Sequence, residues 1–162
     1  MTHHSRARVY RAAAICLILS VGVLKGATVA THVTGAFDVK LTPQASDDKA
    51  EGAALGRMSI DKTYHGDLDA TGKGEMLTAG SSVKDSGVYV AVERVAGALQ
   101  GRKGTFALHH RGVMTRGAPQ LAISVVPDSG TGQLAGLSGT MTINIVDGKH
   151  FYEFDYTIAD AR

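Results

Sequence analysis

Apolar and polar residues alternate one by one over most of this chain. In "FYEFDYTI" the aromatic residues Tyr152, Phe154 and Tyr156 alternate with Glu153 and Asp155. The same alternation recurs in "GAFDVKL", "RMSIDKTYHG", "TFALHHRGVM" and "TMTINIV". Because successive side chains of a strand point to opposite faces, this period predicts half-buried antiparallel strands separated by Gly-rich turns.

The pattern predicts about eight strands. They cover residues 32–41, 57–65, 68–78, 87–99, 104–115, 120–126, 134–146 and 150–158. The polar segment Thr42–Gly56 predicts a loop or a short helical excursion, and no segment predicts a helix longer than a turn or two. Glycine makes up 18 of the last 132 residues, about twice its usual share of roughly 7%. Many short strands without covering helices favour an all-β closed barrel or a sandwich.

The first 30 residues have a different character. Arg6, Arg8 and Arg11 precede the apolar run Ala12–Leu24, and small residues follow as far as Ala30. A basic segment, a short apolar segment and small residues at the cut are the parts of a secretory signal peptide. We therefore expect a leader over residues 1–30, a single domain over residues 31–162, and a secreted or periplasmic protein with no stable membrane span after cleavage.

Two alternatives for this leader stay open. A spanning helix needs about 20 apolar residues, so a permanent membrane anchor is the weaker interpretation. The segment could also be a spurious extension on a cytoplasmic protein.

The leader carries the basic charge of the chain. Four of the 17 Lys and Arg residues lie in it and none of the 15 Asp and Glu residues, so the rest of the chain has 13 against 15 and a net charge of −2. That balance offers no electrostatic case for a nucleic-acid partner. The single cysteine, Cys16, also lies in the leader, so the remainder has no disulfide and no thiol chemistry.

The Gly-rich segment "GTGQLA", residues 130–135, has the spelling G-x-G-x-x-A of a dinucleotide-binding turn. Such a turn must open a helix, because the pyrophosphate sits on the helix N-terminus. The residues that follow include Gly136, Gly139 and two threonines, which are poor helix formers. The segment therefore predicts a turn and a strand that contains both glycines, with no nucleotide and no other cofactor.

The stretch "SGTGQLAGLSGTMTI" resembles a turn shared by allene oxide cyclase-like barrels. Together with "THVTGAFDVK", "GDLDATGKGEML", "YVAVERVAGALQGRKGTFALHHRG" and "DGKHFYEFDY", it makes the chain resemble a bacterial family, domain of unknown function 3224, from about residue 31 to residue 158. The resemblance implies a single allene oxide cyclase-like β-barrel. It implies no settled activity.

A small barrel either holds one apolar ligand or fills its interior with side chains. Polar residues on apolar strand faces are therefore the candidates for a ligand site. His110 shares a face with Phe106 and Leu108, and it could act as a general acid or base. It could equally be a core histidine that bonds a backbone carbonyl.

Glu93 is the second candidate. If the turn between its strand and the next spans Gln100–Lys103, Leu99 faces Gly104 and Glu93 lies directly opposite His110. The alternation is ambiguous here, because the valines at positions 88, 90 and 92 could instead form the buried face. Glu93 would then point to solvent and the pair would not form.

Glu75 is the third candidate, with a solvated strand carboxylate as its alternative. His65 shares a face with Asp61, which indicates a surface pair. No metal site is predicted, because His109 and His110 must point to opposite faces and neither has a partner at chelating spacing. No catalytic residue is assigned.

Three hypotheses for the function remain. The first is an exported binding module for a small hydrophobic ligand. The second is an isomerase or cyclase that acts on an oxygenated hydrophobic substrate, which rests on the resemblance alone. The third is a structural barrel that assembles into a homo-oligomer.

Overall fold

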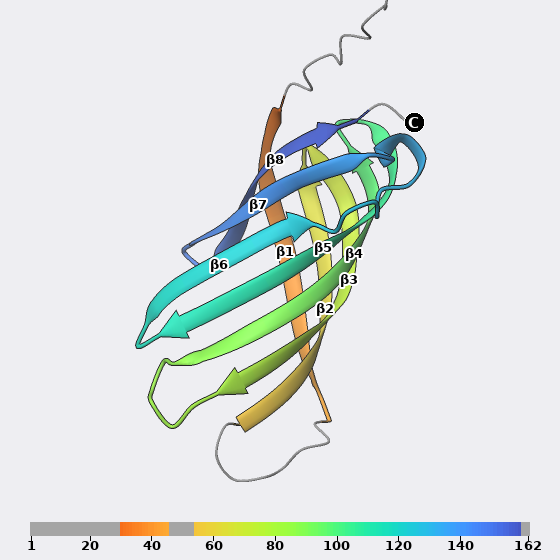
Figure 1. The fold of residues 1–162 in the computed structure, drawn as a ribbon. Coiled ribbons are helices and arrows are strands. Elements are labelled where there is room, and N and C mark those ends of the chain that lie inside the picture. The colour runs from red at the N-terminus through yellow and green to blue at the C-terminus, as the bar shows by residue number, and fades with distance from the viewer. Residues whose placement is uncertain (1–29, 46–53, 160–162) are drawn as a thin grey trace, which may run out of the picture.

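The computed structural model describes residues 30–45 and 54–159 and shows a closed antiparallel β-barrel (Figure 1). Its elements are β1 (Thr31–Gln44), β2 (Ala54–Gly66), β3 (Leu68–Gly80), β4 (Gly87–Leu99), β5 (Arg102–Thr115), β6 (Ala118–Val125), the 3-10 helix η1 (Gly132–Leu134), β7 (Leu137–Val146) and β8 (Lys149–Ile158). Each strand pairs with the next in the chain, and β8 pairs with β1. The predicted all-β barrel of eight strands is confirmed. The predicted leader lies outside the described residues apart from Ala30.

The loop predicted over Thr42–Gly56 is shorter in the structure. Strand β1 continues to Gln44 and β2 begins at Ala54, so both ends of the predicted loop belong to strands. Residues 46–53 lie outside the described part of the chain. Within that described part, no helix is long and apolar enough to cross a membrane.

The turn between β4 and β5 differs from the prediction and changes the register. Gln100 and Gly101 have φ values of 46° and 79°, which is the conformation of a two-residue hairpin turn. Leu99 therefore pairs with Arg102, and the predicted pairing of Leu99 with Gly104 is wrong by two residues. A shift of two keeps every side chain on its face.

The Gly-rich segment packs against the barrel core next to β5. Helix η1 lies within it, and Leu134 of η1 is buried in the barrel core. Gly136 has a φ of +78° and precedes β7, which begins at Leu137. The prediction that Gly136 lies inside the returning strand is therefore wrong, whereas Gly139 does lie in β7.

The barrel interior has two halves. The half next to η1 and the β2–β3 and β4–β5 turns is packed with side chains, and we call it the filled half. Its buried residues include Val33, Phe37, Leu68, Val95, Leu99, Phe106, Leu108, Leu137, Tyr152, Phe154 and Tyr156. The other half lies toward the β3–β4, β5–β6 and β7–β8 hairpins at the left of Figure 1, and the described residues form a small buried cluster there, Ile60, Met76 and Ala91. We call it the open half.

Candidate functional site

The open half of the barrel contains a cavity of about 900 Å³. Its walls are mostly apolar and come from all eight strands, with Phe37, Val39, Leu41, Ile60, Met76, Ala91, Val113, Leu121, Ile143 and Ile145 among the lining residues. The β3–β4 loop, Ser81–Ser86, lines its mouth. This volume falls in the range of roughly 300–1,000 Å³ that is usual for small-molecule sites.

Four polar side chains lie together at the inner end of this cavity, and we call them the polar floor. They are Lys62 and Tyr64 on β2, Glu93 on β4 and His110 on β5. Lys62 and His110 line the cavity, and their residues are 8% and 5% exposed. Tyr64 and Glu93 are fully buried at 0% exposure. Ionisable side chains are rarely buried this deeply unless they pair with one another.

Glu93 connects the members of the polar floor. Its Oε2 accepts a hydrogen bond from Lys62 Nζ at 2.7 Å, and its Oε1 accepts one from the Tyr64 hydroxyl at 2.7 Å. Lys62 Nζ also donates to the Tyr64 hydroxyl oxygen at 3.2 Å and lies 4.9 Å from the centre of the Phe37 ring. Both oxygens of the carboxylate are thus occupied by protein donors.

His110 is the incomplete member of the polar floor. Its Nε2 lies 3.3 Å from Glu93 Oε2, close enough for electrostatic attraction. The two groups do not meet the geometry of a hydrogen bond, and Nε2 is buried without a hydrogen-bond partner among the described residues. An unpaired buried polar atom costs stability, which marks this position as one suited to a ligand.

The polar floor sets the charge states of its own members. Burial by itself would raise the pKa of Glu93. The contact with His110, the charge of Lys62 and the hydrogen bonds from Lys62 and Tyr64 outweigh burial and lower the pKa, so Glu93 is ionised. Burial, and then the charge and hydrogen bond of Glu93, raise the pKa of Tyr64, so Tyr64 keeps its proton.

Gly72 on β3 makes room for the carboxylate. A Cβ atom at Gly72 would overlap Glu93 Oε1 and would lie 3.2 Å from a ring carbon of Tyr64. Gly74, which pairs directly with Glu93, is similarly crowded by the Glu93 backbone. The polar floor therefore reaches from β2 to β4 across a strand that contributes no side chain between them.

Of the three predicted site residues, the structure brings two together. Glu93 and His110 both face the interior, although Glu93 pairs with Leu108 and His110 with Ala91. The outward valines of β4 are exposed, which removes the ambiguity in the alternation. Glu75 lies on the outer face of β3, where its side chain is 65% exposed and its Oε2 lies 2.7 Å from Nη2 of Arg57.

Two members of the polar floor, Lys62 and Tyr64, were absent from the predicted candidates. The alternation itself contained the signal, because Lys62 falls between Ile60 and Tyr64 on an otherwise apolar face. A charged residue at such a position is as informative as His110.

The predicted surface pair of His65 with Asp61 is wrong. His65 pairs with Asp38, and Asp61 pairs with Lys73 instead. Both pairs lie on the outer face of the barrel.

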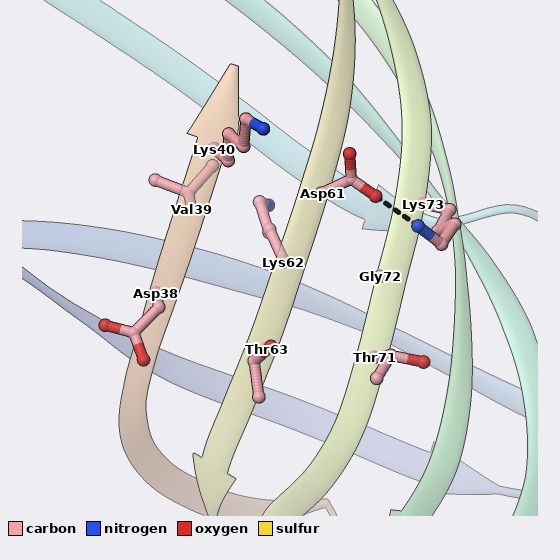
Figure 2. A pocket seen from close by; sticks show the side chains of 9 residues that line it. All are labelled: Asp38, Val39, Lys40, Asp61, Lys62, Thr63, Thr71, Gly72 and Lys73. Carbon is pink, nitrogen blue, oxygen red and sulfur yellow. Dashed lines mark hydrogen bonds and ion pairs between the residues drawn. The ribbon is translucent and has the colours of Figure 1, made fainter. Parts of the chain in front are cut away.

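Figure 2 shows a second, smaller pocket of about 410 Å³ over β1, β2 and β3. The side chains around it include Asp38, Lys40, Asp61 and Lys73, with the ion pair of Asp61 and Lys73 at one side. These charges are exposed to water and partly paired with one another, so they form a solvated surface. We therefore place the candidate site in the open half of the barrel.

Within residues 30–45 and 54–159, no group of three or more His, Cys, Asp or Glu side chains could hold a metal ion. The functional groups of the polar floor are an ammonium group, an imidazole, a phenol and a carboxylate. These groups can bind a polar atom or move a proton.

Comparisons with known proteins place this architecture in a family. No curated protein matches the chain. A solved structure, described as a protein with unknown function from the DUF3224 family from Shewanella oneidensis, is similar to it, with 51% sequence identity and a TM-score of 0.77. The match covers 81% of this chain and 99% of that chain. The family model described as "Protein of unknown function (DUF3224)" matches residues 33–156, and the chain therefore belongs to the DUF3224 family.

Proposed function

We propose that this barrel is a binding module that holds a small, mostly apolar molecule in its open half. The observation that carries the proposal is the cavity of about 900 Å³ with apolar walls and a polar floor. Apolar walls supply affinity through the surface that they remove from water. A few polar groups at fixed positions supply orientation and specificity.

The two halves of the barrel support this assignment. A barrel of eight strands is small enough for side chains to fill it completely, and the filled half is packed in that way with aromatic residues. The open half has the same strand count, but the buried apolar cluster that the described residues form there is small and consists of Ile60, Met76 and Ala91. The cavity therefore results from the side chains that face the open half and not from the number of strands in the barrel.

Fluorescence of N-phenyl-1-naphthylamine, an uncharged apolar probe, tests the proposal. We expect saturable binding with a dissociation constant of about micromolar order. Ile143→Trp places an indole in the cavity wall and should weaken binding about tenfold or more. Thr142→Trp is the matched control, because Thr142 is the adjacent residue of β7 and points to the outside.

The comparison of the two tryptophan variants decides the result. Equal loss of binding in both would show that the probe binds elsewhere on the surface. Absence of saturable binding to the unsubstituted protein would overturn the proposal.

His110 favours a second candidate, an isomerase or cyclase. Its unpartnered Nε2 lies beside Glu93 at the inner end of the cavity, where an imidazole could pass a proton to or from a bound molecule. Mass spectrometry of molecules extracted from the protein and from its His110→Asn variant separates the candidates. An enzyme should yield product in one case and unconverted substrate in the other, whereas a binding module should yield the same molecule from both.

A further inference from the structure

The polar floor indicates which class of ligand the cavity accepts. We infer that the open half binds apolar carboxylic acids, with the carboxylate at Lys62 and His110 and the apolar chain directed toward the mouth, and that His110 takes up a proton when the acid binds. This inference rests on the proposed function, because it requires that the cavity hold a ligand.

Apart from His110, the polar floor presents a hydrogen-bond donor to a ligand. Glu93 is 0% exposed, and its oxygens already accept from Lys62 and Tyr64. The Tyr64 hydroxyl donates its single proton to Glu93. Lys62 uses two of its three N–H bonds, on Glu93 and Tyr64, and one remains available. Lys62 therefore offers one free N–H bond to an acceptor oxygen of a ligand that reaches the polar floor.

The charges of the polar floor favour a carboxylate when His110 is protonated. Lys62 and Glu93 lie 2.7 Å apart and neutralise each other. A carboxylate added to this neutral pair would be a buried charge without a counter-charge, which is costly. His110 supplies the counter-charge when the free carboxylate, the neutral imidazole and one proton from solvent combine into an imidazolium–carboxylate pair.

Among the described residues, the titratable group in contact with His110 is Glu93 on β4. Lys62 on β2 and Tyr89 on β4 line the same cavity, and Tyr64 on β2 bonds to Glu93. Strand β6 places the apolar Ile123 opposite His110.

Farther around the cavity, β8 contributes His150, which packs against the Phe37 ring. His150 is the other histidine among the described residues that line the cavity. A test of proton uptake must include it.

Isothermal titration calorimetry with octanoate, 1-octanol and octylamine compares three ligands that share an eight-carbon alkyl group and differ in the polar head group. We expect octanoate to bind about tenfold more tightly than 1-octanol, as a charge-assisted hydrogen bond permits. Titrations at about pH 7.5 in buffers of different ionisation enthalpy should show uptake of about one proton per octanoate. Octylamine should bind most weakly, because Lys62 repels its ammonium group and it presents no acceptor oxygen.

Substitutions locate the head group. His110→Asn should abolish proton uptake and the preference for octanoate over 1-octanol. His109→Asn is the matched control, since His109 is the adjacent residue and points to the outside of β5, and it should change neither. The double variant Lys62→Met with Glu93→Gln removes both charges of the buried pair together, and it should also lose the preference for octanoate.

Several outcomes would overturn the inference. Equal binding of octanoate and 1-octanol, with both lost in Ile143→Trp, would leave the binding module in place and reject the acid. Loss of octanoate binding in Lys84→Met but not in His110→Asn would place the carboxylate at the mouth. Proton uptake that depends on His150 would reject the role of His110. If neither these ligands nor N-phenyl-1-naphthylamine bind, the proposed function fails as well.

Discussion

Glu93 supplies the hydrogen bonds and the negative charge that stabilise the other polar residues buried inside the barrel. It is the shared partner of Lys62, Tyr64 and His110, and it has no exposed surface. Removing one partner of a buried ion pair leaves an uncompensated charge, which costs more than the intact pair contributes. The stability of the polar floor therefore depends on this one carboxylate.

Glu93→Gln should lower the free energy of unfolding by about 3–5 kcal/mol, because Lys62 loses its counter-charge inside the barrel. The measurement is urea denaturation at neutral pH. Glu75→Gln is the matched control, since the Glu75 pair with Arg57 is exposed, and it should cost less than about 1 kcal/mol.

The double variant Lys62→Met with Glu93→Gln leaves no unpaired charge and should recover part of the loss. Equal losses in Glu93→Gln and Glu75→Gln would contradict this account.

The same substitution has a pH signature. The folded state lowers the pKa of Glu93 below its ordinary value of 4.5, so the stabilisation is complete above pH 4.5 and is lost as the pH falls through the folded pKa. The free energy of unfolding should therefore decline more steeply below about pH 4.5 in the unsubstituted protein than in Glu93→Gln.

At this scale the sequence predicted part of the site. Glu93 and His110 were recognisable as polar residues on apolar faces. Glu75 was not separable from them, because glycines at positions 72 and 74 replace the apolar residues that would have marked the inner face of β3. At residues 72–75 the sequence of β3 therefore shows no difference in hydrophobicity between the inner and the outer face.

At the scale of an element, β3 is fitted to the side chain of its neighbour. Its inward positions next to Glu93 are Gly72 and Gly74, and a Cβ at either would overlap Glu93. Glycine normally weakens a strand interior. Here the missing side chains create the volume that the carboxylate occupies.

Gly72→Ala should displace the Glu93 carboxylate and lower the free energy of unfolding by about 1–3 kcal/mol, as expected for overpacking. Gly80→Ala is the matched control at the end of β3, because the nearest atom to its new Cβ would be the Ala54 carbonyl oxygen at 3.9 Å. Urea denaturation of both variants gives the comparison. A Gly72→Ala variant as stable as Gly80→Ala would show that the carboxylate can move without cost.

The strands were predictable as elements, but the β4–β5 register was not. The two-residue turn places Gln100 at a φ of 46°, a conformation for which Asn or Asp is the usual sequence signal. Without that signal a four-residue turn was equally plausible. Glu93 and His110 nevertheless remained on one face, because the error was an even number of residues.

At the scale of the whole molecule, the alternation pattern by itself left a barrel and a sandwich both possible, and it was the resemblance to a known family that implied the barrel. The distinction depends on whether the first and last strands pair, which no local pattern reports. Strand β1 pairs with β8 from Thr31 opposite Tyr156 to Phe37 opposite His150, and this pairing closes the barrel. The cavity was equally unpredictable, because it depends on how the inward side chains of all the strands fill the interior together.

We expect the chain to be exported and cleaved after Ala30. When the full sequence is expressed in a bacterial host, intact-mass analysis of the periplasmic fraction should find a polypeptide that begins at Thr31. The control is a variant with Arg6, Arg8 and Arg11 replaced by glutamate, which should stay uncleaved in the cytoplasm because the basic segment is lost. A full-length, cytoplasmic product from the unsubstituted sequence would reject export in that host.

The pairing of β1 with β8 also governs the order of events during synthesis. Thr31 emerges from the ribosome early, and its partner Tyr156 is translated 125 residues later. Contacts of such long sequence separation form slowly, because the chain entropy of closing the intervening loop must be overcome first. The barrel therefore cannot close before β8 has been synthesised, and until then β1 lacks one of its two neighbouring strands.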